Sequence, residues 1–360
     1  MDILDYVKKK EKLLEKCSRI LRDPHVFEFN YIPEQPLMRG ELKPVIDALA
    51  RYSKTGISNH ILLVGSRGCG KTLSVQYLRG IFSKRGLNVL YVNCRFYNTS
   101  YKILAYLLGV RARGVSFDEL TQRFSEQHAG RTVVILDEID LLSERDRNKD
   151  ILYFLSRSDA SYMAILLSNS TKWMANLDES IQSTLQPELI YFHPYSANEI
   201  SKILGSRAKL GMRSYTESVV KQIAALVAKY SNSDVRIALK TLYYWATEPN
   251  ISLEENFKRA RRDVVVDVVK SLSDKNLLIL KAGAGPEKTV KEVYSLYRGL
   301  CVRHKEEPFS YVHFYSSLSY LQSLGLILLI STKIRRTYTK TLQLSFQPEV
   351  LESFWRLRFC

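Results

Sequence analysis

One stretch, beginning at residue 60, constrains the fold of this chain more than any other feature. It reads HILLVGSRGCGKT over residues 60–72, so an apolar run leads into the pattern G-x-x-x-x-G-K-[ST], and helically spaced apolar residues follow. Glycines in such a loop let backbone N–H groups reach phosphate oxygens, and the N-terminus of the next helix adds positive potential. The stretch predicts a phosphate-binding loop between a buried strand and a helix. The alternative is an ordinary glycine loop.

The residue types in this loop suggest individual roles. Lys71 is placed to reach the β- and γ-phosphates of a nucleoside triphosphate, and the Thr72 hydroxyl is a candidate ligand of Mg²⁺. We expect contacts to ATP or ADP from eight consecutive residues, Gly65, Ser66, Arg67, Gly68, Cys69, Gly70, Lys71 and Thr72.

A second motif places two carboxylates at the end of another buried strand. Residues 132–140 read TVVILDEID, and open parallel sheets bind ligands at the carboxyl ends of their strands. Asp137 is therefore a candidate Mg²⁺ ligand, and Glu138 is a candidate general base that polarises the attacking water. Asn169 follows the next apolar strand, where its amide could orient water near the γ-phosphate. The alternatives are an acidic solvated loop for the carboxylates and a plain turn for Asn169.

Strands and helices alternate between residues 60 and 170, which predicts a parallel α/β sheet covered on both faces. The chain has 360 residues, enough for two or three domains. No apolar run approaches the roughly 20 residues that a bilayer-spanning helix needs, so we expect no membrane partner. The five cysteines are scattered and form no C-x-x-C pair, which favours a reducing compartment, cytosolic or nuclear.

The C-terminal part of the chain concentrates positive charge. The formal net charge is +16, which indicates either mere solubility or a polyanionic partner. After residue 272, three helical segments precede two apolar strands, and the strands are joined by the basic run TKIRRTYTK at residues 332–340. No carboxylate occurs between Pro308 and Gln347. This is the sequence outline of a winged helix, so nucleic acid is the expected polyanion.

The last helix of that outline is the candidate recognition helix. Its apolar stripe, Phe314, Leu318 and Leu321, is expected to be buried. Side chains on the other face would then enter a major groove, and these are Val312, His313 and Ser316. The wing offers candidate contacts to phosphates or to a minor groove at Lys333, Arg335, Arg336 and Lys340. The alternative is an ordinary basic hairpin.

Together these motifs resemble those of the AAA+ ATPases, and three further stretches narrow the resemblance to the archaeal origin-recognition initiators. The three are Glu188–Tyr195, Ser233–Leu239 and Thr289–Tyr297. The resemblance implies an α/β AAA+ P-loop core with a three-layer parallel sheet, an all-α lid and a C-terminal winged-helix domain. The implied boundaries are 1–26 for an N-terminal helical extension, 27–194 for the core, 195–268 for the lid and 269–360 for the winged helix.

The resemblance also implies roles for particular residues. Asn169 matches the position called sensor 1, and Arg236 matches sensor 2, a lid arginine that reaches the nucleotide phosphates. Arg236 could equally be a surface residue of a helix. In relatives, a helix inserted between the second strand and the carboxylate strand touches DNA. Its counterpart lies at residues 98–113, where packing is an equal alternative and the candidate contacts are Tyr101, Lys102, Arg111 and Arg113.

One departure from the family pattern changes the expected activity. Where relatives carry an arginine finger, this chain has Ser180 and Gln182. An arginine finger accelerates hydrolysis by roughly 10³–10⁵, so we expect weak ATPase activity and long occupancy by ATP or ADP with Mg²⁺. The residues expected to support this slow catalysis are Glu138, Asp137, Asn169 and Arg236.

The resemblance implies an initiator that recognises double-stranded origin DNA and helps recruit or load the replicative MCM-type helicase, with a paralogous initiator subunit as a further partner. ATP and ADP would act as a slow conformational switch. We expect the protein in the cytoplasm, associated with the nucleoid, or in the nucleus of a eukaryote. The alternative is a signalling or regulatory ATPase of AAA+ or STAND type, whose winged helix mediates protein contacts.

Overall fold

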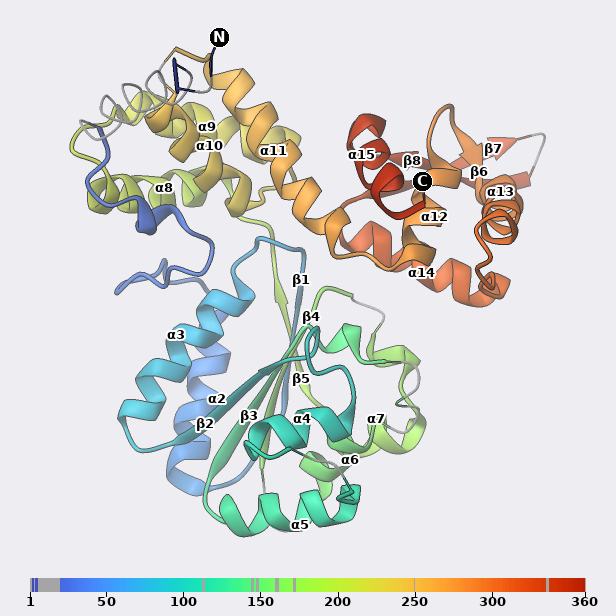
Figure 1. Cartoon of the computed structure of the whole chain (residues 1–360). Coiled ribbons are helices and arrows are strands. Elements are labelled where there is room, and N and C mark those ends of the chain that lie inside the picture. The colour runs from blue at the N-terminus through green and yellow to red at the C-terminus, as the bar shows by residue number, and fades with distance from the viewer. Residues whose placement is uncertain are drawn as a thin grey trace. The chain divides into compact units, whose positions relative to one another are not determined.

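The computed structural model describes residues 2, 4–5, 20–111, 114–143, 146, 149–158, 162–170, 173–248, 250–334 and 337–359, without the side chains at 176, 323, 332–334 and 337–338. The chain forms two compact units (Figure 1): a core unit, Ile32–Pro194, and a second unit that joins Met1–Tyr31 to Tyr195–Cys360. The expected N-terminal helical extension lies largely outside the described residues. Within the described ranges, no helix is long and apolar enough to cross a membrane.

The core unit is built on a five-stranded parallel sheet in the order β2-β3-β4-β1-β5. The strands are β1 (Ile61–Gly65), β2 (Asn88–Asn93), β3 (Thr132–Asp137), β4 (Met163–Ser168) and β5 (Glu188–Phe192). Every residue of β3 and β4 is buried, because helices cover both faces of a parallel sheet and leave its interior strands no polar side. The predicted parallel sheet is confirmed.

Helices complete a three-layer arrangement around this sheet (Figure 1). On one face, α2 (Leu42–Thr55) and α3 (Lys71–Lys84) share a buried apolar cluster with Ile61 and Leu63 of β1. On the other face, a second cluster joins alternate strand residues such as Leu62 to helices later in the chain. Those helices are α4 (Ser100–Leu107), α5 (Phe117–Gln127), α6 (Asp150–Arg157) and α7 (Glu179–Leu185). The alternation of side chains along β1 explains the two cores.

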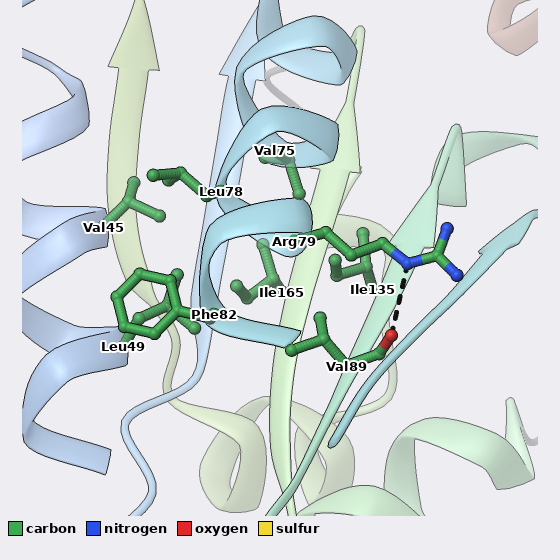
Figure 2. Close-up of a pocket in the computed structure, with 9 residues that line it drawn as sticks. All are labelled: Val45, Leu49, Val75, Leu78, Arg79, Phe82, Val89, Ile135 and Ile165. Carbon is green, nitrogen blue, oxygen red and sulfur yellow. Dashed lines mark hydrogen bonds between the residues drawn. The ribbon is translucent and has the colours of Figure 1, made fainter. Parts of the chain in front are cut away.

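Figure 2 shows how α2 and α3 pack on the sheet through a narrow apolar gap. All of the side chains that line the gap are apolar except Arg79, whose Nε donates to the Val89 carbonyl at 3.2 Å. The gap leaves no room for a water molecule, and therefore none for a nucleotide. The side chains around the gap pack α3 against the strands.

The second unit begins with a helical bundle, which fits the expected lid. Its helices are α8 (Ala197–Gly211), α9 (Glu217–Tyr230), α10 (Val235–Thr247) and α11 (Leu253–Lys270). The segment before the core unit packs here too, through the short helix η1 (Pro24–Phe27). A Cβ atom at Gly211 would lie 2.6 Å from the Phe27 ring, so only glycine permits this close approach.

The C-terminal part of the second unit is a winged helix, as predicted. It contains α12 (Asp274–Gly283), β6 (Lys288–Thr289), α13 (Val290–Arg303), α14 (Tyr311–Ser323), β7 (Ile327–Ile334), β8 (Thr337–Leu344) and α15 (Pro348–Phe359). The strands form an antiparallel sheet in the order β6-β8-β7. Phe314, Leu318 and Leu321 of α14 are fully buried, which confirms the expected stripe of the recognition helix. The sequence pattern predicts neither β6 nor α15.

Candidate functional site

The phosphate loop connects β1 to α3 in a conformation that glycine alone adopts easily. Gly70 stands immediately before α3 with a φ of 90°, in the left-handed region that disfavours other residues. At the start of the loop, a Cβ atom on Gly65 would lie 2.4 Å from the Phe192 carbonyl oxygen. The glycines of the motif therefore serve both the turn and the tight packing against β5.

One hydroxyl in the loop suits an anionic ligand. Ser66 Oγ is buried and has no hydrogen-bond partner among the described residues. A buried hydroxyl left without a partner costs roughly 1–3 kcal/mol, so a ligand oxygen here would restore a lost interaction. Together with the N-terminus of α3, this donor fits the phosphate groups of ATP or ADP.

Lys71 lies at the centre of the site. Its ammonium donates to the Gly65 carbonyl at 2.7 Å, the Ser66 carbonyl at 3.1 Å and the Asn169 side-chain oxygen at 3.1 Å. Burial lowers the pKa of Lys71, and the charges of Cys69, Asp137 and Asp140 oppose that shift. The three oxygens that accept from the ammonium are neutral, and the Cys69 sulfur at 3.7 Å is a weak acceptor. An anionic phosphate oxygen would therefore bind the ammonium more strongly.

The two candidate Mg²⁺ ligands are neighbours. The Thr72 hydroxyl donates to Asp137 Oδ2 at 2.9 Å, and the Tyr91 hydroxyl donates to the same oxygen at 2.8 Å. Burial raises the pKa of Asp137, although these hydrogen bonds counteract it. Mg²⁺ prefers oxygen ligands and usually combines one or two protein ligands with water and phosphate. The Thr72–Asp137 pair fits such an ion bound together with a nucleotide.

Glu138, the candidate general base, is held by two arginines. Arg95 donates to both of its carboxylate oxygens, from Nε at 2.7 Å and from Nη2 at 2.9 Å, and Arg67 Nη2 lies 3.7 Å from Oε1. Burial alone would raise the pKa of Glu138, but the hydrogen bonds and charge of Arg95 outweigh it and lower the pKa. Glu138 also has a φ of 53°, so its backbone is fixed in an uncommon conformation. This carboxylate is restrained and weakly basic.

Arg95 is not predicted by any motif in the sequence, although the strand order carries a signal for it. Arg95 follows the end of β2, and β2 pairs with β3 so that Asn93 lies opposite Asp137. A residue two positions beyond Asn93 is therefore near Glu138. Because charged residues beyond neighbouring parallel strands gather at one edge, the order of the strands would have been enough to find it.

Asn169 joins the site from the end of β4. Its side-chain oxygen accepts from Lys71, and its backbone N–H donates to Asp140 Oδ1 at 3.0 Å. Asp140 is thereby part of the same hydrogen-bonded group. The structure thus brings together four of the predicted residues, Lys71, Thr72, Asp137 and Asn169, around the phosphate loop.

The lid arginine and the altered finger positions lie elsewhere in the chain. Arg236, in the second unit, pairs with Asp234 through Nη2 and Oδ2 at 2.5 Å at the start of α10, so its reach to a nucleotide stays a prediction. In the core unit, Gln182 of α7 donates to the Leu177 carbonyl at 2.6 Å, and Ser180 is exposed. Neither side chain carries the positive charge that a finger supplies.

The candidate DNA contacts of α14 present a mixed surface. Val312 is 77% exposed, and the His313 ring stacks on Phe309 at 3.9 Å between centroids. The Ser316 hydroxyl donates back to the Val312 carbonyl at 3.2 Å. On the wing, Lys340 lies over the Tyr315 ring at 5.4 Å. Arg335, Arg336 and the side chain of Lys333 lie outside the described residues.

The candidate DNA contacts near α4 include one residue that packs within the core unit and others that are exposed. The Tyr101 hydroxyl donates to the Val115 carbonyl at 2.9 Å inside the core unit, which supports the packing alternative for this residue. Lys102 is exposed and donates to the Asn98 side chain at 3.1 Å. Arg111 is exposed, and Arg113 lies outside the described residues. The cations Lys102 and Arg111 therefore remain available at the surface.

Comparison with known proteins gives a consistent result. A family model described as an AAA domain matches residues 57–174. The ORC1-type DNA replication protein 1 of Methanosarcina acetivorans is 30% identical, over 94% of this chain and 91% of that protein. The protein of the same description from Sulfolobus acidocaldarius is 30% identical, over 78% of this chain and 79% of that protein.

Solved structures agree on the fold. The structure of the Aeropyrum pernix ORC1 protein in complex with DNA matches with a TM-score of 0.70 and 26% identity, covering 95% of this chain and 98% of that chain. The Aeropyrum pernix ORC2 protein matches with a TM-score of 0.57 and 22% identity, over 94% and 99% of the two chains. The predicted fold class and the resemblance on which it drew are both confirmed.

Proposed function

Because this chain belongs to the family of ORC1-type DNA replication proteins, we propose that it is an ATP-binding replication initiator that recognises double-stranded origin DNA. In this proposal it also helps to recruit or load the replicative MCM-type helicase, alongside a paralogous initiator subunit. Aeropyrum pernix ORC1, a relative whose structure was solved in complex with DNA, is similar over nearly the whole chain, which supports DNA as the partner.

The observation that carries the proposal is the hydrogen-bonded group around the phosphate loop. Lys71 would bind the β- and γ-phosphates, and the N–H groups of the loop with the Ser66 hydroxyl would surround them. Thr72 and Asp137 would hold Mg²⁺, which neutralises phosphate charge when it is bound. Asn169 positions Lys71 through its side-chain oxygen and would orient a water molecule.

Two features support a slow switch rather than a motor. Arg95 and Arg67 pair with the Glu138 carboxylate, which would restrain it as a general base. In addition, α7 has neutral residues at the finger positions. With a restrained base and no arginine at positions 180 and 182 of α7, bound ATP would persist, and so would the ADP that forms from it. Arg236 of the lid would then sense the phosphates, so that the nucleotide biases the relation between core and lid.

The DNA-binding half of the proposal rests on the winged helix. Its α14 keeps an apolar side buried and leaves Tyr311, Val312 and Ser316 exposed, as a helix that enters a groove requires. Lys340 and the basic residues of the wing would contact phosphates. Since phosphate contacts release counterions, binding by several of them depends steeply on salt.

A salt titration of duplex binding tests the proposal directly. Affinity should fall by about 10³-fold or more between roughly 50 and 200 mM salt if six or more phosphates are contacted, and footprinting on genomic DNA should reveal a protected site. Binding that is negligible or flat with salt would favour the signalling ATPase instead. No protected site, with or without partner initiators, would remove the origin claim.

A further inference from the structure

Arg39 is a buried cation that lies beside the phosphate loop but does not belong to the G-x-x-x-x-G-K-[ST] motif. It precedes α2 and is only 5% exposed. Its guanidinium donates from Nη1 to the Cys69 carbonyl at 2.9 Å and from Nη2 to the His193 carbonyl at 2.9 Å. Nη2 also pairs with Glu41 Oε1 at 2.7 Å. Arg39 thus connects the loop to the end of the core unit.

The bond to Cys69 has a geometric consequence for the loop. A trans peptide is planar, so its carbonyl and its N–H point in opposite directions. By holding the Cys69 carbonyl, Arg39 fixes the plane of the Cys69–Gly70 peptide and turns the Gly70 N–H away from itself. Gly70 lies immediately before α3, where N–H groups are available to an anion.

The hydrogen bond from Arg39 to the His193 carbonyl fixes the chain just after β5. His193 follows β5 and stands next to Pro194, the last residue of the core unit. The Glu41 carboxylate that pairs with Arg39 also accepts from the His193 N–H at 3.4 Å, and the guanidinium lies 5.6 Å from the centre of the Phe192 ring. The loop and the exit of the chain from the core are therefore held by one side chain.

We propose that Arg39 is a positioning residue for the nucleotide, which orients the Gly70 amide toward phosphate and couples the phosphate loop to the chain at His193. The inference rests on the proposed binding of ATP or ADP and concerns how the loop is prepared for it. Lysine cannot replace this arginine, because one ammonium group cannot bridge two carbonyls and a carboxylate in a planar fork.

Arg358 provides a matched control. Its guanidinium also donates to two backbone carbonyls, Leu272 at 2.7 Å and Lys270 at 2.8 Å, and pairs with the Asp274 carboxylate at 2.9 Å. It lies in the second unit, and the partners of these hydrogen bonds belong to that unit too. Either replacement disrupts bonds to two backbone carbonyls and one carboxylate, although the Arg358 side chain is 28% exposed and that of Arg39 only 4%. Cys69 is a partner of Arg39 alone among these two arginines.

The experiment measures the Kd of full-length protein for a fluorescent ADP analogue with Mg²⁺, at a temperature where each variant is folded. Arg39→Lys should weaken binding about tenfold, as expected when a charge-assisted hydrogen bond to phosphate is misdirected. Arg358→Lys should stay within about twofold. Thermal unfolding without nucleotide reports the purely structural loss in each variant. Equal ADP affinity in the two variants overturns the inference, whatever their melting temperatures.

A milder variant covers the case in which Arg39→Lys does not fold. Glu41→Gln removes the ion pair that orients the Arg39 guanidinium toward the Cys69 carbonyl, so ADP binding should weaken by about two- to threefold. An unchanged Kd for this variant would then overturn the inference. Lys71→Ala separates the two proposals: if it binds ADP as tightly as the natural protein does, nucleotide binding by this loop fails. If Lys71→Ala loses ADP but Arg39→Lys does not, only the role of Arg39 fails.

Discussion

The phosphate-loop region and the winged helix hold their candidate residues in different ways. Around the loop, Lys71 and Asp137 are buried, and each has several hydrogen-bond partners within the core unit. On the winged helix, Val312 is 77% exposed, and Lys340 contacts one aromatic ring. One region is organised before any ligand arrives, and the other presents a charged surface to the solvent.

This difference decides how each region should respond to change. A buried polar group without its partner loses interactions in a medium of low dielectric constant, so single substitutions there have large effects that salt hardly alters. An exposed cation acts through a screened field, so its removal has a small effect that depends on salt. The four predictions that follow test this contrast, in order of decreasing effect.

Lys71→Ala should produce the largest effect. Hydrogen bonds from a charged group contribute roughly 1.5–3 kcal/mol each, so the Kd for ATP or ADP should rise about 100-fold or more. Isothermal titration calorimetry at low and moderate salt measures it. Lys84→Ala, an exposed residue at the other end of α3, is the control. A Lys71→Ala variant that binds within about threefold of the natural protein would contradict a preorganised site.

Asp137→Asn should abolish the dependence of ATP binding on Mg²⁺. The amide retains the shape of the side chain but lacks the charge that holds the ion, so affinities with and without Mg²⁺ should converge from about a tenfold difference. Titrations in Mg²⁺ and in EDTA test this. Asp118→Asn, exposed on α5, should keep the difference. Persistence of a full Mg²⁺ effect in Asp137→Asn would place the ion elsewhere.

Arg95→Ala should increase ATP hydrolysis by about three- to tenfold, because it frees the Glu138 carboxylate to act as a general base. Steady-state phosphate release measures the rate, and the double variant with Glu138→Gln should return to the background. Arg85→Ala, at an exposed position after α3, leaves Glu138 untouched and should hydrolyse ATP at the natural rate. A slower Arg95→Ala enzyme would mean that Arg95 assists catalysis instead of restraining the base.

Lys340→Ala should produce the smallest effect. One lost phosphate contact lowers duplex affinity by about two- to fourfold and reduces the slope of log K against log salt by about 1. Fluorescence anisotropy at several salt concentrations resolves both values. Lys221→Ala, exposed on α9 of the same unit, controls for net charge. Equal slopes in the two variants would show that Lys340 does not meet DNA.

The residues that the sequence predicts well are those set by local pattern. Lys71 and Thr72 belong to one short motif, and Asp137 ends an apolar strand, so each could be found from its neighbours in the chain. Arg95 and Arg39 were missed, because their partners are remote: Glu138 is 43 positions from Arg95, and His193 is 154 positions from Arg39. Contacts of this kind follow from strand order and from loop paths, which periodicity does not encode.

The wing shows the same limit. The apolar runs predict strands at Ile327–Ser331 and Thr341–Phe346, whereas the structure extends β7 to Ile334 and places β8 at Thr337–Leu344. The basic residues in this stretch weaken the apolar alternation, while strand pairing such as Ser331 with Lys340 and Thr332 with Thr339 continues through it. Backbone hydrogen bonds join the two strands whatever the side chains are. A hydrophobic pattern therefore cannot predict how far the strands extend through the polar part of a hairpin.

The path of the chain through its two units has a consequence for its evolution and engineering. The core unit, Ile32–Pro194, is an insertion between two flanking segments that fold together. The hydrogen bond from Arg39 to His193, at 2.9 Å, fastens the entry of the insertion to its exit. A domain whose ends are joined in this way can be gained or exchanged as one piece, and it tolerates circular permutation through a short linker between those ends.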